Sequence, residues 1–332
     1  MDFRNTTTAP ASHLKTTFGK EHMLAAVIAR PTFRVEGGQL VPTPDFEWPA
    51  REPANNPEDA MPPDMPFLTG GIDVLVMGSL WQPNAWPGLE LTAEIRIGQR
   101  YLRRITAIGN RRWVRQNGWL VPGDPEPFVS MPLSYENAFG GQAETDQGAF
   151  AWPANPSGKG FYLTPERAEG QPLPNLEDPD HRITTTEDRP EPMATGPYPE
   201  GASLRVENAL ELDLESDNPG IKRITPLAFN RAHPRMILAP ANTPQPGELV
   251  EVTHASPHGP LQFPIPEQAF HAEVSLENRR YAFPLHVDLI AMLLDEQRVV
   301  LGYRVVFKYR LVKGDRRSVT LQPGPVPEVA SA

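Results

Sequence analysis

The sequence contains no cysteine among its 332 residues. A chain without cysteine has no disulfide framework, no zinc–thiolate site and no thiol nucleophile. It also lacks any apolar run near the ~20 residues that a membrane helix needs. Its opening segment has no apolar stretch of the kind that marks a secretory signal. We therefore expect a soluble, cytoplasmic protein that does not span a membrane.

An excess of basic charge is also missing, because 31 lysines and arginines face 41 acidic residues and the net charge is −10. Nucleic-acid binding requires a basic surface, so we expect no nucleic-acid partner. The charge is uneven, however. Residues 96–115, the first basic ribbon, hold seven arginines and no acid, and residues 298–317, the second basic ribbon, hold seven basic residues and one acid. These ribbons indicate either contact with an acidic partner or edge strands protected from aggregation by charge.

Proline is abundant, with 40 residues, and it is excluded from helix interiors and central strands. Residues 89–97 alternate between apolar and polar side chains, which is typical of a half-buried strand. Residues 111–121 form a predicted hairpin that turns at Asn117-Gly118. The pattern predicts a mainly β fold, an antiparallel two-sheet sandwich or an open barrel, with long Pro/Gly-rich loops and few short helices.

The predicted organisation is one large domain with short extensions. Residues 1–20 are expected to form an N-terminal arm, residues 21–320 a single β-rich domain, and residues 321–332 a disordered tail. Within the domain, two sheets over 21–122 and 200–315 are possible, bridged by a loop region over 123–199.

Three short motifs lie in that loop region: Tyr-Glu-Asn-Ala-Phe-Gly-Gly at 135–141, Asn-Pro-Ser-Gly-Lys-Gly-Phe at 155–161, and Pro-Leu-Pro-Asn-Leu-Glu at 172–177. Glycine reaches positive φ without strain, proline restricts φ, and asparagine bonds nearby backbone. Such residues direct the path of a loop and supply no nucleophile or metal cage. The motifs therefore favour a shaped binding scaffold.

The three motifs, in this order, resemble a bacterial family of unknown biochemical activity whose genes sit beside type VI secretion genes. Further matches are Asp73-Val74-Leu75-Val76-Met77-Gly78, Arg111-Arg112-Trp113, the run from Pro127 to Glu136, Gly247-Glu248-Leu249-Val250 and Phe263-Pro264-Ile265-Pro266. The resemblance covers roughly residues 20 to 310.

The resemblance implies a non-enzymatic adaptor or chaperone that loads an effector toxin onto the secretion spike. Its expected partners are the toxin and a spike protein of the VgrG or PAAR type, and no cofactor is expected. Loop aromatics and basic pairs are typical of interface anchors. The predicted partner-binding residues are Arg103, Arg104, Arg111, Arg112, Trp113, Trp152, Asn155, Lys159 and Phe161.

Two alternatives stay open. One is a hydrolase that uses Glu136, in which case Glu136 would lie in a deep pocket. We favour a structural role for this residue, as a buried carboxylate that accepts loop hydrogen bonds. The other alternative is a structural component of the secretion particle.

Other catalytic readings are weaker. Ser157-Gly158-Lys159 departs from a phosphate loop, because Gly160 stands where that motif needs Ser or Thr. A metal site at His254, His258 and His271 and a dyad of His286 with Asp288 have little support.

Overall fold

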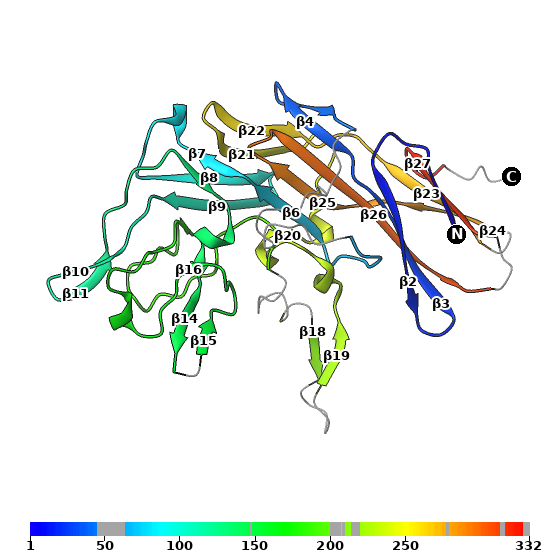
Figure 1. Ribbon diagram of the computed structural model, residues 1–332. Helices are drawn as coiled ribbons and strands as arrows, with labels where there is room; N and C mark the ends of the chain where they lie inside the picture. Colours follow the sequence, from blue (N-terminus) through cyan, green and yellow to red (C-terminus); the bar gives the residue numbers. More distant parts are fainter. Residues whose placement is uncertain are drawn as a thin grey trace.

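A computed structural model describes residues 1–44, 64–146, 148–199, 207, 210–213, 220–276, 279–312 and 316–327. In this part of the chain the fold is mainly β, as predicted, with several mixed and antiparallel sheets (Figure 1). The named helical elements are 3₁₀ turns of three or four residues: η2 (Pro83–Ala85), η3 (Tyr135–Asn137), η4 (Pro165–Ala168), η5 (Pro226–Phe229), η6 (Pro234–Met236) and η7 (Pro240–Asn242). None of the described helices is long and apolar enough to cross a membrane.

The largest sheet has eight strands, in the order β2-β3-β26-β25-β6-β20, with β4 paired to β26 and β5 paired to β4. They are β2 (Ala11–Phe18), β3 (His22–Ala29), β4 (Thr32–Glu36), β5 (Gln39–Pro42), β6 (Ile72–Met77), β20 (Ile237–Leu238), β25 (His286–Leu293) and β26 (Arg298–Arg310). β6 runs parallel to β25, and the other pairs are antiparallel. β6 is almost continuously apolar, which suits a strand covered on both faces.

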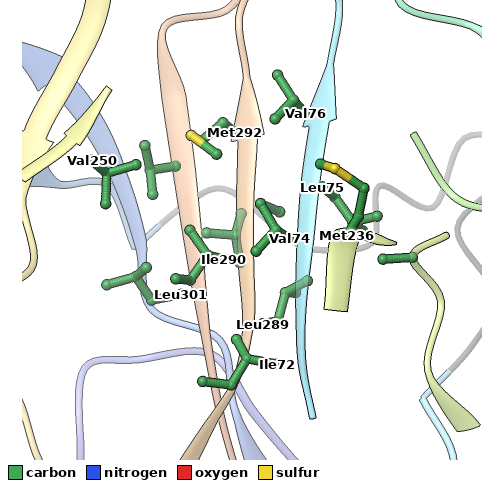
Figure 2. Close-up of a cluster of buried hydrophobic side chains, with 14 of the residues drawn as sticks. Ile72, Val74, Leu75, Val76, Met236, Val250, Leu289, Ile290, Met292 and Leu301 are labelled. Carbon is green, nitrogen blue, oxygen red and sulfur yellow. The ribbon is translucent and has the colours of Figure 1, made fainter. Parts of the chain in front are cut away.

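The main hydrophobic core lies on this sheet. Figure 2 shows side chains from β6, β25 and β26 meeting at its centre, where they pack with side chains from β21 and η6. The labelled residues are Ile72, Val74, Leu75, Val76, Met236, Val250, Leu289, Ile290, Met292 and Leu301. Burial of this apolar area stabilises the fold by roughly 25 cal/mol per Å².

Two further sheets flank the core. The five-stranded sheet, in the order β17-β9-β8-β21-β22, consists of β8 (Glu90–Ile97), β9 (Tyr101–Ile108), β17 (Leu176–Glu177), β21 (Leu249–Ser256) and β22 (Gly259–Pro264). The four-stranded sheet, in the order β1-β27-β23-β24, consists of β1 (Asp2–Asn5), β23 (Phe270–Leu276), β24 (Arg279–Pro284) and β27 (Ser318–Pro323). All three sheets take strands from both halves of the chain, so the sheets do not divide at residues 122 and 200 as envisaged.

The remaining strands form two-stranded ladders. They are β7 (Ser79–Trp81) with β12 (Ser130–Pro132), β10 (Trp113–Gln116) with β11 (Trp119–Pro122), β13 (Phe139–Gly140) with β16 (Lys159–Gly160), β14 (Gln142–Thr145) with β15 (Gly148–Ala151), and β18 (Leu210–Asp213) with β19 (Gly220–Ile224). The β10–β11 hairpin turns at Asn117-Gly118, as predicted, with both residues at positive φ.

The first and the last strands of the described chain are paired. The segment expected as an N-terminal arm holds β1, which pairs in parallel with β27, and β2, which pairs with β3. Residues 321–323 of the expected tail complete β27, and residues 328–332 lie outside the described part. The first and the last described strands, β1 and β27, therefore meet in the four-stranded sheet (Figure 1).

Candidate partner-binding surface

The three sequence motifs come together in space. The first and second pair through the parallel ladder β13–β16, and the first and third meet in a bridge between Ala138 and Leu176. The amide of Gly141 donates to the carbonyl of Asn155 at 2.8 Å. The amide of Asn175 donates to the carbonyl of Asn137, also at 2.8 Å. We call residues 111–183, apart from residue 147, the loop module.

Asn155 braces the first motif from within. Its side chain is fully buried, and its Nδ2 atom donates to the carbonyl oxygens of Tyr135 at 2.8 Å and Phe139 at 3.0 Å. Buried carbonyls without such donors are costly. Asn155 is out of reach of a partner, so the prediction that it makes an intermolecular contact is wrong.

Trp113 is also a core residue, 2% exposed. Its Nε1 atom donates to the hydroxyl of Tyr162 at 2.7 Å, and that hydroxyl donates to the carbonyl of Pro172 at 2.9 Å. A second hydrophobic core forms around it from Phe139, Tyr162, Ala168, Leu173 and Ile183. The predicted partner contact by Trp113 is therefore wrong as well.

Trp152 and Phe161, by contrast, take part in a chain of rings that reaches the surface. Phe139, 1% exposed, meets Trp152 edge-on at a centroid distance of 5.6 Å. Trp152 contacts Phe161 at 5.1 Å, and Phe161 contacts Phe150 at 5.6 Å. Phe150 is 45% exposed. We call these four residues the aromatic chain; it links a rigid core to an exposed ring.

Most arginines of the first basic ribbon are engaged within the molecule. Arg111 pairs with the buried Glu177, and Arg104 pairs with Asp180 at 2.6 Å on the surface. The other ion pairs of the ribbon are Arg96–Glu94, Arg100–Glu248 and Arg115–Glu169. Acidic side chains of the same molecule therefore neutralise much of the positive charge that was expected to attract a partner.

Arg103 and Arg112 have other acceptors. Arg103 lies against the sulfur of Met193, with 3.0 Å between Nη2 and Sδ. Arg112 is exposed and donates from Nη1 to the carbonyl of Gly170 at 2.9 Å. Of the four predicted arginines, Arg104 and Arg112 are exposed, and Arg103 and Arg111 are partly buried.

Lys159 links two motifs. Its Nζ atom donates to Oδ1 of Asn175 at 2.5 Å, and the side chain is half-buried. Burial lowers the pKa of Lys159, and the nearby Glu136 carboxylate opposes that change. The Nδ2 atom of Asn175 in turn donates to the carbonyl of Ile108 at 2.8 Å, which ties the module to β9.

Glu136 is exposed, so the expectation of a buried carboxylate is wrong. It lines a cavity of about 420 Å³ together with Asp295, and the Oδ1 atom of Asp295 accepts from the amide of Ser79 at 3.2 Å. The carboxylate that is buried in the module is Glu177, which accepts from Arg182 at 3.0 Å. Burial raises the pKa of Glu177, against the attraction of its arginine partners.

The structure also places the residues considered for a metal site and for a His286–Asp288 dyad. Among the described residues, no group of three or more His, Asp or Glu side chains is placed to hold a metal ion. Asp288 is engaged by arginines instead of His286: both of its carboxylate oxygens accept from Arg30, and Oδ2 also accepts from Arg304.

The most exposed aromatic of the loop module was not among the predicted contacts. Trp119, beside the turn of the β10–β11 hairpin, is 77% exposed, and its place after Asn117-Gly118 was the available signal. Phe150 sits in β15 with no comparable signal in its sequence spacing.

One family model matches residues 19–304, and it is described as an uncharacterized protein conserved in bacteria (DUF2169). The chain belongs to the DUF2169 family. The DUF2169 match includes the whole loop module, and it leaves out β1, β2 and β27. No curated protein and no solved structure matches the chain.

Proposed function

We propose that this protein is a non-enzymatic adaptor or chaperone of a type VI secretion system, which binds an effector toxin and helps to load it onto a spike protein of the VgrG or PAAR type. The resemblance of the three motifs to the family encoded beside secretion genes motivates the proposal. The structural observation that supports it best is the aromatic chain.

A ring that is exposed on a rigid support suits the anchoring of a partner. A side chain loses rotamer freedom when it binds a partner. This entropic cost is smaller where neighbouring rings already restrict the side chain. Phe150 contacts Phe161, and Phe139, the buried end of the chain, is held in the β13–β16 ladder. Aromatic anchors of this kind dominate binding energy in many interfaces.

The test is co-expression with the toxin-like product of the neighbouring gene, followed by light scattering on the eluted complex. We expect a stoichiometric complex, with the toxin insoluble on its own. Phe150→Ala should weaken the complex by about tenfold or more, in the range of an interface hot spot. Leu249→Ala is the matched control, because Leu249 is 46% exposed and lies in β21, outside the module.

Both variants should keep the thermal midpoint of the parent protein, since surface truncations change stability by about 0.5 kcal/mol or less. Failure of the parent protein to form any complex with the toxin would contradict the adaptor role. A complex that tolerates Phe150→Ala and Leu249→Ala equally would exclude the aromatic chain as its anchor. A ring of several copies in the same scattering run would favour a structural component of the particle.

The cavity that holds Glu136 and Asp295 favours a hydrolase as the second candidate. Most enzymes that cleave glycans by acid–base chemistry use a pair of carboxylates, and both of these residues line the cavity. The test is turnover of glycan and peptide substrates by the parent protein and by Glu136→Gln. Activity that disappears in Glu136→Gln would support this candidate, and equal activity in both would exclude it.

A further inference from the structure

Two strands with open edges, β24 and the last part of β26, lie on the side of the molecule opposite the loop module (Figure 1), and both contribute residues to one groove. β24 is the last strand of its sheet and pairs only with β23 among the described strands. β26 pairs with β25 only as far as Arg304, although β26 continues to Arg310. Residues 305–310 therefore have a partner strand on the β3 side and none of the described strands on the other.

A groove of about 340 Å³ lies between these two edges, and its floor is aromatic. Tyr281 and Phe283 of β24 stack at a centroid distance of 6.1 Å. Phe283 stacks on Phe307 of β26 at 5.7 Å with only 7° between the rings, and Phe307 meets Tyr309 at 6.2 Å. Alternate residues of a strand share a face, which is why 281 and 283, and likewise 307 and 309, line up.

The walls of the groove carry positive charge. The charged residues among those that line it are Arg279, Lys308 and Arg310, and none of the lining residues is acidic. Arg310 pairs with Glu21 at 2.9 Å, but both side chains are more than 60% exposed, so the pair contributes little. The ammonium of Lys308 lies 5.0 Å above the ring of Phe18 and stays at the surface.

We propose that this groove binds an extended acidic segment of a partner protein, with apolar side chains at alternate positions, by strand addition. The open backbone edges supply main-chain hydrogen bonds, the ring stack takes the apolar side chains, and the basic side chains pair with the acidic ones. The inference deepens the proposed adaptor function, because it states the chemistry of the segment that a cargo protein presents. It also assigns a role to the second basic ribbon.

The groove is tested with a defined probe: a fluorescein-labelled nonapeptide of alternating glutamate and valine with a central phenylalanine. Binding is measured by fluorescence anisotropy on the full-length protein. We expect saturable binding to the parent protein and a loss of about tenfold or more in the double variant Arg279→Glu/Lys308→Glu. The matched control is Arg34→Glu, an exposed arginine of β4 that is 51% exposed and already has an acidic neighbour, Glu36.

Hydrogen exchange read by mass spectrometry separates strand addition from simple charge attraction. Bound peptide should protect amides in residues 279–284 or 305–310, because a pairing strand engages backbone N–H groups. Weak binding of a peptide in which lysine replaces every glutamate, together with protection at one of these edges, supports the proposal.

Three results would overturn it. They are no binding of the acidic peptide, equal weakening by Arg34→Glu and the groove double variant, or binding without protection at either edge. The peptide measurement needs no toxin, so a missing toxin complex rejects the adaptor role while the groove is still judged on its own. Conversely, if the toxin complex forms but the groove does not bind the acidic peptide, only the proposal for the groove is rejected.

Discussion

At the scale of single residues, buried polar side chains give the loop module its rigidity. Asn155 satisfies two carbonyls of the first motif, and Asn175 connects Lys159 to the backbone of β9. A region with few ladder hydrogen bonds needs such donors, because buried backbone carbonyls without partners are costly. The side chains that make the motifs recognisable in sequence therefore act inside the molecule.

Replacing Asn155 with alanine should lower the free energy of unfolding by about 1–3 kcal/mol, since the carbonyls of Tyr135 and Phe139 each lose a buried hydrogen bond. Urea denaturation followed by circular dichroism measures the change. Asn242→Ala is the control, because Asn242 is exposed in η7. Equal stability of Asn155→Ala and the control would contradict the bracing role.

His233 makes the stability of the fold depend on pH. It is 1% exposed, its Nδ1 accepts from the amide of Arg235, and its ring meets Tyr198 at 4.8 Å. Burial, with smaller contributions from Arg103 and Arg235, lowers its pKa from 6.5 to about 3. The unfolded chain therefore binds a proton on His233 at a higher pH than the folded protein does. Stability contributed by the neutral ring is full above pH 6.5 and is lost as the pH falls toward 3.

We expect His233→Asn to flatten the fall in unfolding free energy on acidification from pH 6.5 to 4.5. Asparagine keeps an acceptor for the Arg235 amide and does not titrate. The parent should lose up to about 1.4 kcal/mol per pH unit more than the variant over this window. The measurement is urea denaturation at several pH values, with the exposed His258→Asn as control. The same slope in the parent protein and in His233→Asn would show that His233 is not buried in its neutral form.

At the scale of elements, local patterns predicted strands and turns well. The alternation over 89–97 became β8, and Asn117-Gly118 became a hairpin turn. Partner choice was not predictable, because it depends on contacts far apart in sequence. Residues 22–41 illustrate this, because β3 pairs with β2 and β26, whereas β4 turns at Gly37-Gly38 to pair with β5.

The candidate site shows the same contrast between local features, which were predictable, and spatial arrangement, which was not. The sequence located the motifs and the basic ribbons, yet residue type alone did not separate a buried Trp113 from an exposed Trp119. The groove between β24 and β26 depends on where β25 stops pairing, which is a property of register. Register is determined by the whole sheet, so no short window of sequence contains it.

The β13–β16 ladder makes a specific prediction for Gly140. Its φ is +149°, and an added Cβ would lie 2.1 Å from the carbonyl oxygen of Asn155. Gly140→Ala should therefore cost more than about 3 kcal/mol, because backbone strain adds to a clash with backbone. Gly118→Ala in the β10–β11 turn is the matched control, with φ of +86° and open space around it, and should cost about 1 kcal/mol. Thermal unfolding distinguishes the two, and similar midpoints would contradict the close approach of the first two motifs.

At the scale of the whole molecule, an ionic cluster joins segments from both halves of the chain. Asp288 of β25 accepts from Arg30 at 2.6 Å and from Arg304 at 2.7 Å. Asp64 accepts from the same two arginines and from Arg231 at 2.6 Å. Burial acts to raise the pKa of Asp288, but the attraction of Arg30 and Arg304 outweighs it, so the pKa lies below its ordinary value. Through Asp64, the cluster thus attaches the segment that begins at residue 64 to the eight-stranded sheet.

Asp288→Asn tests whether this cluster acts as a single unit. The substitution leaves Arg30 and Arg304 buried, at 4% and 6% exposure, with less negative charge between them. Removing one member of a buried ion pair costs about 3–5 kcal/mol, so we expect a loss of that size in urea denaturation. Glu36→Gln, in the exposed Arg34–Glu36 pair, should change stability by about 0.5 kcal/mol or less. Because the cluster joins Arg30, which directly follows β3, to β25 and β26, unfolding of Asp288→Asn should remain one cooperative transition at a lower midpoint. Two separate transitions would instead show that the sheet and the segments attached to it unfold independently.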